Sequence, residues 1–290
     1  MDETKTVNKP FKRVGLYAHF ESQPIVQTLK KVFQFIQTKS MAYVLETNTA
    51  KHLDQTSHVQ ANQLADYCDL LLVIGGDGSV LAAAQSASPQ QLPIIGIHQG
   101  RLGFLADINP NQMDQLSKIM QGHYQLEKRM QLSITCDPKG SKAYQALNEC
   151  VISSHQSHKL IDFDVLMDDK PLSYFRANGL IVCTPTGSTA YALSAGGPIV
   201  LPNIPVMTIV PICSHTLNAR PLVVSDDHTI TVKLAKRSLP HAHMILDGQP
   251  IDHLHLTQVS IQVSKQTVDL VHPENFCFYQ VLKTKLNWQT

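Results

Sequence analysis

The feature that most constrains the fold is a change in the hydrophobic pattern near residue 124. Before this point, short apolar runs alternate with segments of helical spacing, and the runs cover residues 14–17, 42–45, 70–74 and 93–97. Strands that alternate with helices usually form a parallel sheet with helices on both faces. The sequence therefore predicts an α/β domain over residues 1–123.

After residue 124 the helical segments almost disappear. Strand-like runs follow one another, and they cover residues 132–136, 146–153, 163–167, 179–183, 206–210, 222–224, 229–234 and 259–263. Polar turns separate most of these runs, which is typical of a β-sandwich. We therefore predict an all-β sandwich over residues 124–274. Residues 275–290 regain a helical pattern and form a separate tail.

Charge and composition exclude several classes of protein. The 24 Lys and Arg residues balance 23 Asp and Glu residues, so no net field attracts nucleic acid or an anionic membrane. The longest apolar stretch, residues 198–213, is interrupted by Pro202, Asn203, Pro205 and Pro211, and we expect no membrane segment. The first residues lack the apolar core of a signal peptide, and the six cysteines form no CxxC pair. We expect a cytoplasmic protein with reduced cysteines.

The strongest local signal is Gly75-Gly76-Asp77-Gly78-Ser79, which lies between an apolar strand and an alanine-rich helix. Glycines at such a turn let the backbone approach a ligand, and the free N–H groups of the following helix suit a phosphate. The alternative is an ordinary tight turn. A carboxylate repels phosphate, so Asp77 needs a purpose: to take a proton from an attacking hydroxyl, to hold Mg²⁺, or to hydrogen-bond a ribose.

A second glycine-rich turn, with Gly100, Gly103 and Phe104, follows the next strand. Ligands of open parallel sheets lie outside the carboxyl ends of the strands, so both turns can face one site. The alternative is that the glycines only turn the chain and Phe104 lies in the core. A P-loop motif is absent, and Leu81 stands where a dinucleotide fingerprint has its third glycine.

Two further constellations lie in the predicted sandwich. The strand 179–183 ends in a run of hydroxyl and glycine residues that includes Thr186, Gly187 and Ser188. Such a run suits a ribose, a carboxamide or a phosphate, although it could simply cap a helix. Asn148 and Glu149 interrupt an apolar run and could clamp a sugar diol, or they could form a solvated strand edge.

Together these segments resemble the bacterial, ATP-dependent NAD kinases. The match also includes the segment from Pro211 to Val224 and the late motif Asp247-Gly248-Gln249. The Gly-Gly-Asp-Gly motif is shared with lipid kinases and phosphofructokinases, whereas the run from Thr184 to Tyr191 is much more specific. Two alternatives stay open: a lipid kinase, and a non-catalytic dinucleotide sensor.

The resemblance implies a nucleotide-binding α/β domain, an NAD-binding β-sandwich, and a tail that returns to the first domain. It implies transfer of the γ-phosphate of ATP to the adenosine-ribose 2′-hydroxyl of NAD, with Mg²⁺ or another divalent metal, by a homodimer or homotetramer. Asp77 would be the catalytic base, and Gly75, Gly76, Ser79 and the residues of the other two loops would contact nucleotide. We expect no metal site formed by the protein alone, although His241 and His243, like His253 and His255, share a strand face.

The resemblance also assigns substrate contacts to individual residues. They are Gly78, Asn148, Glu149, Lys159, Arg176, Asn178, Thr189, Ala190, Tyr191, Ser194 and Gln249. Arg176 matches a position typical of the subgroup that prefers NAD and ATP. Asn178 departs from the aspartate usual in the family: it keeps a carbonyl acceptor and loses the charge.

Overall fold

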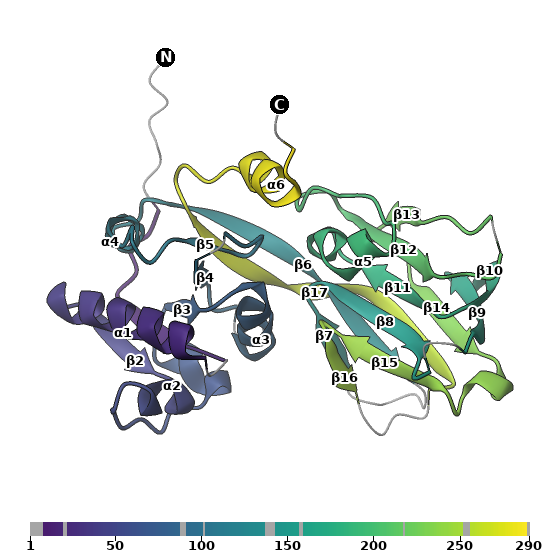
Figure 1. Cartoon of the computed structure of the whole chain (residues 1–290), viewed down its shortest axis with the longest axis horizontal. Helices are drawn as coiled ribbons and strands as arrows, with labels where there is room; N and C mark the ends of the chain where they lie inside the picture. Colours follow the sequence, from purple (N-terminus) through teal and green to yellow (C-terminus); the bar gives the residue numbers. More distant parts are fainter. Residues whose placement is uncertain are drawn as a thin grey trace, which may run out of the picture. The chain divides into compact units, whose positions relative to one another are not determined.

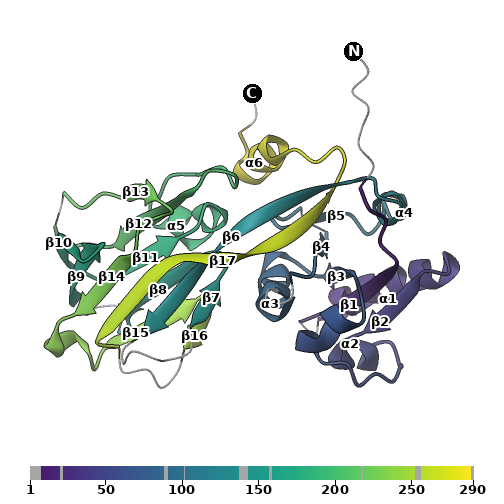
Figure 2. The ribbon, with the colours of Figure 1, turned by 180° about the vertical axis from the view of Figure 1, so that it is seen from behind.

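The computed structural model describes residues 8–19, 22–87, 91–100, 102–136, 143–156, 159–216, 218–251 and 256–288. Two compact units divide the chain. The first contains the residues up to Lys128 and those from Val268 onward, and the second contains Arg129–Thr267. The chain passes between them within β6 (Tyr124–Cys136) and within β17 (Gln258–Pro273), two paired strands that run side by side in Figure 2.

The first unit has a parallel sheet in the order β4-β3-β1-β2, with β5 beside β4. Its strands are β1 (Arg13–Tyr17), β2 (Ala42–Leu45), β3 (Leu70–Ile74), β4 (Ile94–Ile97) and β5 (Ala106–Ile108). Its helices are α1 (Gln23–Thr38), α2 (Thr47–Lys51), η1 (Ala61–Asp66), α3 (Asp77–Ala87), α4 (Asp114–Met120) and α6 (Phe278–Leu286). The sheet continues on the far side of β4, where Leu270 of β17 pairs in parallel with Ile94 (Figure 1).

The second unit contains two sheets. One has six antiparallel strands in the order β13-β12-β11-β8-β15-β16. They are β8 (Glu149–Ser154), β11 (Gly179–Cys183), β12 (Val206–Ile212), β13 (Leu222–Ser225), β15 (Ala242–Leu246) and β16 (Gln249–Ile251). The other joins β10 (Lys170–Ala177), β9 (Ile161–Met167) and β14 (Ile230–Leu234) to β17, while β6 pairs with β7 (Tyr144–Ala146).

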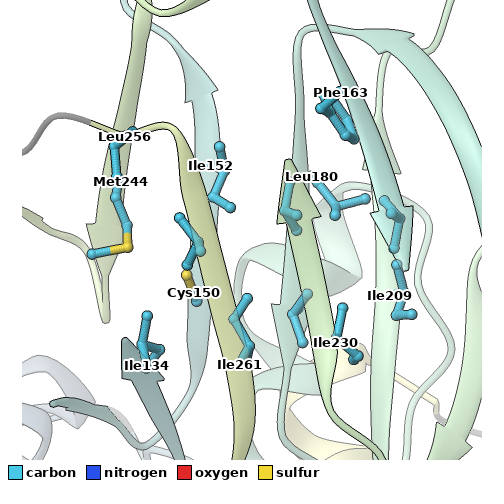
Figure 3. Packing of buried hydrophobic residues seen from close by; sticks show 14 of the residues in the cluster. Ile134, Cys150, Ile152, Phe163, Leu180, Ile209, Ile230, Met244, Leu256 and Ile261 are labelled. Atoms are coloured by element: carbon cyan, nitrogen blue, oxygen red, sulfur yellow. The ribbon is translucent and has the colours of Figure 1, made fainter. Parts of the chain in front are cut away.

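A single apolar cluster joins the two sheets of the second unit (Figure 3). From the six-stranded sheet it contains Ile152, Leu180 and Ile209, and from the other Phe163, Ile230 and Ile261. A separate cluster fills the first unit and includes Leu29, Val32 and Ile36 of α1. The predicted fold class, an α/β domain followed by a β-sandwich with a returning tail, is confirmed.

Several details differ from the predictions. The boundaries predicted at 123/124 and 274/275 fall at the start of β6 and just beyond the end of β17. The division between the two units lies within these strands instead, at 128/129 and 267/268, because each strand passes from one unit to the other. The run 146–153 is not one strand: β7 ends at Ala146, β8 begins at Glu149, and each belongs to a different sheet. The segment of helical spacing that precedes β3 is a 3₁₀ helix, η1. None of the helices in the described ranges meets the length and apolar content of a membrane span.

Candidate active site

The glycine-rich turn of the first unit connects β3 to the N-terminus of α3. Gly75 has a φ of 147°, and a Cβ there would lie 2.1 Å from Ser79 Oγ, so this position requires glycine. Gly76 and Gly78 are exposed. The Ser79 hydroxyl is buried and has no hydrogen-bond partner in the described part of the chain. The turn therefore combines close packing on one side with open backbone on the other.

Asp77, the first residue of α3, is bound to the second glycine-rich loop. Its Oδ2 accepts the N–H of Phe104 at 3.0 Å, and its Oδ1 accepts those of Leu105 and Ala106 at 2.9 and 3.2 Å. A Cβ on Gly103 would lie 2.0 Å from Asp77 Oδ1, so this glycine is needed for close approach. The three bonds occupy three of about four acceptor positions of a carboxylate. Asp77 is therefore fixed in orientation and has one acceptor position left for a ligand.

Phe104 lies at the centre of this loop rather than fully in the core. Its side chain is half-buried and packs against Phe278 of α6, with ring centroids 6.2 Å apart. Gly100 is exposed, with a φ of 84°, and a Cβ added there would meet no atom within 4 Å. His98, which precedes the loop, is buried, and burial lowers its pKa against the opposing effect of Asp107. His98 is therefore neutral at pH 7.

In the second unit, Asp247 holds the segment that contains Asn148 and Glu149. Its Oδ2 accepts the N–H of Leu147 at 2.7 Å, and its Oδ1 accepts those of Asn148 and Glu149 at 2.7 and 3.1 Å. The sequence predicts a contact for Gln249, which is exposed on β16, but no individual role for Asp247. As in the first unit, one aspartate binds three consecutive backbone N–H groups.

The hydroxyl run contacts the same segment from β11. Thr184 donates its hydroxyl to the Leu147 carbonyl at 2.6 Å and its N–H to the Asn148 carbonyl at 2.9 Å. A Cβ on Gly187 would lie 2.2 Å from the Asn148 carbonyl oxygen, so this glycine also permits close approach. The chain therefore bends between β7 and β8 because Asp247 and the Thr184 turn both bind it there.

Glu149 is a buried carboxyl with an unpartnered oxygen, Oε2, among the described atoms. Burial, and secondly the charge of Asp247, raise its pKa to about 8. Burial also raises the pKa of Asp247, against the effect of its three backbone hydrogen bonds. At pH 7 Glu149 is mostly protonated, so in the ligand-free protein it can donate as well as accept a hydrogen bond.

The remaining residues of the hydroxyl run differ in accessibility. Ser188 is fully buried: its Oγ contacts the carbonyls of Pro185 and Val200 and accepts the Val200 N–H. Thr186 is buried as well, and Arg129 Nη1 donates to its hydroxyl at 3.3 Å. The half-buried members are Thr189 and Ala190, and the exposed ones are Tyr191 and Ser194 of the short helix α5 (Tyr191–Ser194).

The other predicted contacts lie on different strands and loops. Lys159 is exposed, and its Nζ lies 3.1 Å from His241 Nε2. Arg176 is exposed at the end of β10, opposite Asp162 of β9. Asn178 is half-buried and its backbone bridges Ile212 and Ser154. Of the paired histidines, His243 stacks on His155 with centroids 4.2 Å apart, and residues 253 and 255 lie outside the described residues.

A sequence signal for Asp247 does exist. Asp247 and Gly248 form the two-residue loop between β15 and β16, and both have positive φ, 49° and 79°. Aspartate-glycine is among the strongest signals for such a hairpin. The signal predicts the turn but not its partner, because the bound segment lies about 100 residues earlier in the chain.

The fold and the family models define the class of protein. The chain shares its fold with a solved yeast NADH kinase in complex with NADH (TM-score 0.87, 20% identity, 97% of this chain and 89% of that one). A solved NAD kinase from Archaeoglobus fulgidus in complex with ATP is also similar (TM-score 0.76, 25% identity, 96% and 100% covered). Residues 14–124 match the ATP-NAD kinase N-terminal domain, and residues 147–273 match the C-terminal domain. The chain is a phosphotransferase with an alcohol group as acceptor.

Curated relatives identify the family. An NAD kinase of Marinomonas sp. (strain MWYL1) is 37% identical over 97% of this chain and 98% of its own length. An NAD kinase of Coxiella burnetii (strain RSA 493 / Nine Mile phase I) is 38% identical over 98% and 97%. The chain belongs to the NAD kinase family. The predicted family, enzyme class and NAD kinase function are confirmed.

Proposed function

We propose that the chain transfers the γ-phosphate of ATP to the adenosine-ribose 2′-hydroxyl of NAD, giving NADP and ADP. The observation that carries this reaction is the fixed carboxylate of Asp77 at the start of α3, beside the exposed backbone of Gly76 and Gly78. Phosphoryl transfer depends mainly on positioning and on neutralising charge, so a preorganised turn of this kind suits it.

Asp77 accepts the proton of the attacking 2′-hydroxyl in this proposal. Three backbone N–H groups fix its orientation, and the remaining acceptor position is free for the hydroxyl. The N–H groups at the start of α3 and the buried Ser79 hydroxyl are the donors that the loop offers to phosphate oxygens.

A divalent metal fits this site only if it arrives with ATP. The described residues contain no group of three or more potential metal ligands. Magnesium commonly keeps several waters and binds through one or two carboxylates and the substrate phosphates. Bound in this way, it would neutralise phosphate charge. Asp77 is the carboxylate at the turn that could contribute a ligand.

For the acceptor, we propose that Asn148 and Glu149 bind a ribose of NAD. Their segment is held from two sides, by Asp247 and by the Thr184 turn, so its polar groups are preorganised. The exposed members of the hydroxyl run, Tyr191 and Ser194, and the exposed Gln249 then complete the acceptor contacts.

We also propose the finer properties that the family resemblance implies. The first is a preference for NAD over NADH and for ATP over polyphosphate, which we attribute to Arg176. The others are a cytoplasmic location and assembly as a homodimer or homotetramer. All six cysteines are free thiols, which suits a reducing compartment. Specificity constants for both dinucleotides and both donors, together with analytical ultracentrifugation, test these properties; equal constants for NAD and NADH would remove the role of Arg176.

The test of the activity is an assay for NADP with purified protein, NAD, ATP and Mg²⁺. We expect turnover by the wild type and a loss of about 10²–10⁴-fold in Asp77→Asn, the range typical of a general base. NAD affinity should stay near that of the wild type. NAD binding without any NADP formed by the wild type would make the chain a dinucleotide sensor instead.

A further inference from the structure

The C-terminal helix α6 has a lysine where its buried stripe should continue with an apolar residue. Phe278, Val281 and Leu282 follow the i, i+3, i+4 spacing of a helix face, and Val281 and Leu282 are buried. Position i+7 on this face is Lys285, which is exposed. Lys283, two residues earlier and off this face, is exposed as well. Lys285 therefore lies on the same face of α6 as the buried residues that pack against the rest of the first unit.

Both ends of this face contact Phe104. The Phe278 ring lies 6.2 Å from the Phe104 ring, and Lys285 Nζ lies 5.7 Å from the Phe104 ring centroid. That distance is within the range of a cation–π contact. The backbone N–H of the same Phe104 donates to Asp77. One residue thus joins the lysine of α6 to the aspartate of the glycine-rich turn.

A phosphate ligand at the Asp77 loop needs a positive charge that the glycine-rich turn itself does not supply. The turn from Gly75 to Ser79 contributes a carboxylate and no basic side chain, although the proposed ligands carry several phosphate charges. Lys285 forms no ion pair with a carboxylate in the described part of the chain, so its charge is not neutralised there. Lys285 and Asp77 both affect the pKa of His98, in opposite directions, so both are near that ring.

We propose that Lys285 is a phosphate-binding residue, whose ammonium group binds phosphate oxygens of a ligand held at the Asp77 loop. The phosphate can be that of the donor ATP or the new 2′-phosphate of NADP, since both carry the same chemistry. This inference rests on the proposed function, and it assigns to the C-terminal helix a direct part in ligand binding.

Calorimetric titrations with ATP, adenosine, NADP and NAD test the proposal. Lys285→Met removes the charge and keeps the apolar stem, and Lys283→Met is the matched control on the same helix. We expect Lys285→Met to weaken binding of ATP, of NADP or of both by roughly 5- to 20-fold, a value lowered by solvent exposure. Adenosine and NAD should bind as in the wild type. The Lys283→Met variant should stay within about twofold.

The pattern of losses identifies the phosphate. A loss for ATP alone assigns Lys285 to the donor, and a loss for NADP alone assigns it to the 2′-phosphate. Unchanged constants for both ligands, or an equal loss for adenosine and NAD, would overturn the proposal. The Lys285→Arg variant keeps the charge and should keep the affinity; if it binds ATP and NADP as weakly as Lys285→Met does, the positive charge is not what binds the phosphate, and the proposal is overturned.

Wild-type turnover separates this inference from the proposed function. Absence of NADP formation by the wild type would contradict the function itself. Normal wild-type turnover combined with unaltered phosphate affinity in Lys285→Met would contradict only the role of Lys285. Thermal melts of each variant identify any loss that comes from unfolding.

Discussion

Replacing Asp247 by asparagine should loosen the segment that contains Asn148 and Glu149 without disturbing the hairpin turn. Asparagine is nearly the same size and, like aspartate, tolerates the left-handed conformation that position 247 adopts, with a φ of 49°. The substitution removes the charge and one of the two acceptor atoms. If the amide oxygen keeps the bonds to Asn148 and Glu149, its NH₂ group faces the N–H of Leu147.

The expected loss of folding stability follows from these three hydrogen bonds. Two change from charge-assisted to neutral bonds, and the third is lost and leaves a buried N–H without an acceptor, which costs about 1–3 kcal/mol. Removing a buried charge offsets part of this loss, because burial raises the pKa of Asp247 and so disfavours its ionised form. We expect a net decrease of about 2–4 kcal/mol in the free energy of unfolding of the second unit.

Hydrogen–deuterium exchange is the direct assay, because it reports on the amides that Asp247 binds. We expect faster exchange at residues 147–149, a lower melting temperature and weaker NAD binding, with ATP binding unchanged. Asp227→Asn makes the same chemical change at a largely exposed side chain and should stay within about 0.5 kcal/mol of the wild type. Unaltered exchange at residues 147–149 in Asp247→Asn would refute the reasoning.

Two further predictions concern Gly103 and Glu149. Gly103→Ala should abolish turnover, because the added Cβ would lie 2.0 Å from Asp77 Oδ1. The comparison variant is Gly76→Ala, whose added Cβ meets no atom within 4 Å. Steady-state rates and melting curves of the two variants are the measurements, and an active Gly103→Ala would show that the loop can shift without cost. The folded protein keeps the Glu149 proton up to a pKa of about 8, well above the unfolded value near 4.5, so wild-type stability should fall as pH rises between these values. Glu149→Gln should lack this slope in urea unfolding measured from pH 5 to 9, and identical slopes would contradict the raised pKa.

The fold is predictable where the sequence pattern is local. The four strands β1 to β4 are short apolar runs, so their predicted bounds lie close to the observed ones. The helix α1 has a clear helical stripe of buried apolar residues. The strands β10, β15 and β16 are absent from the prediction because two-residue turns precede or separate them. These turns are Asp168-Asp169 and Asp247-Gly248, and both residues of each turn have positive φ. The spacing of apolar residues, on which the strand predictions depend, gives no information about such turns. Strand β5 has only three residues, too few for a period to appear.

The candidate site is predictable only in part, for a related reason. Glycines and hydroxyls mark loops, so Gly75 and the run near Gly187 stand out from the sequence. The contacts that fix these loops are not visible there, because Asp77 binds amides about 27 residues away and Asp247 binds amides about 100 residues away. Phe104 stands out in its loop, but its position between Asp77 and Lys285 depends on the tertiary fold.

The order in which the chain is made has a consequence for how the two units fold. The second unit is one uninterrupted stretch, Arg129–Thr267, whereas the first unit needs residues from both sides of it. Ile94 cannot gain its β17 neighbour, Leu270, until the ribosome has made the whole second unit. The parallel strands of the first unit, which are made earlier, therefore keep part of one edge uncovered while the second unit is being made. During that interval, the part of the protein that is synthesised first is the part most exposed to aggregation.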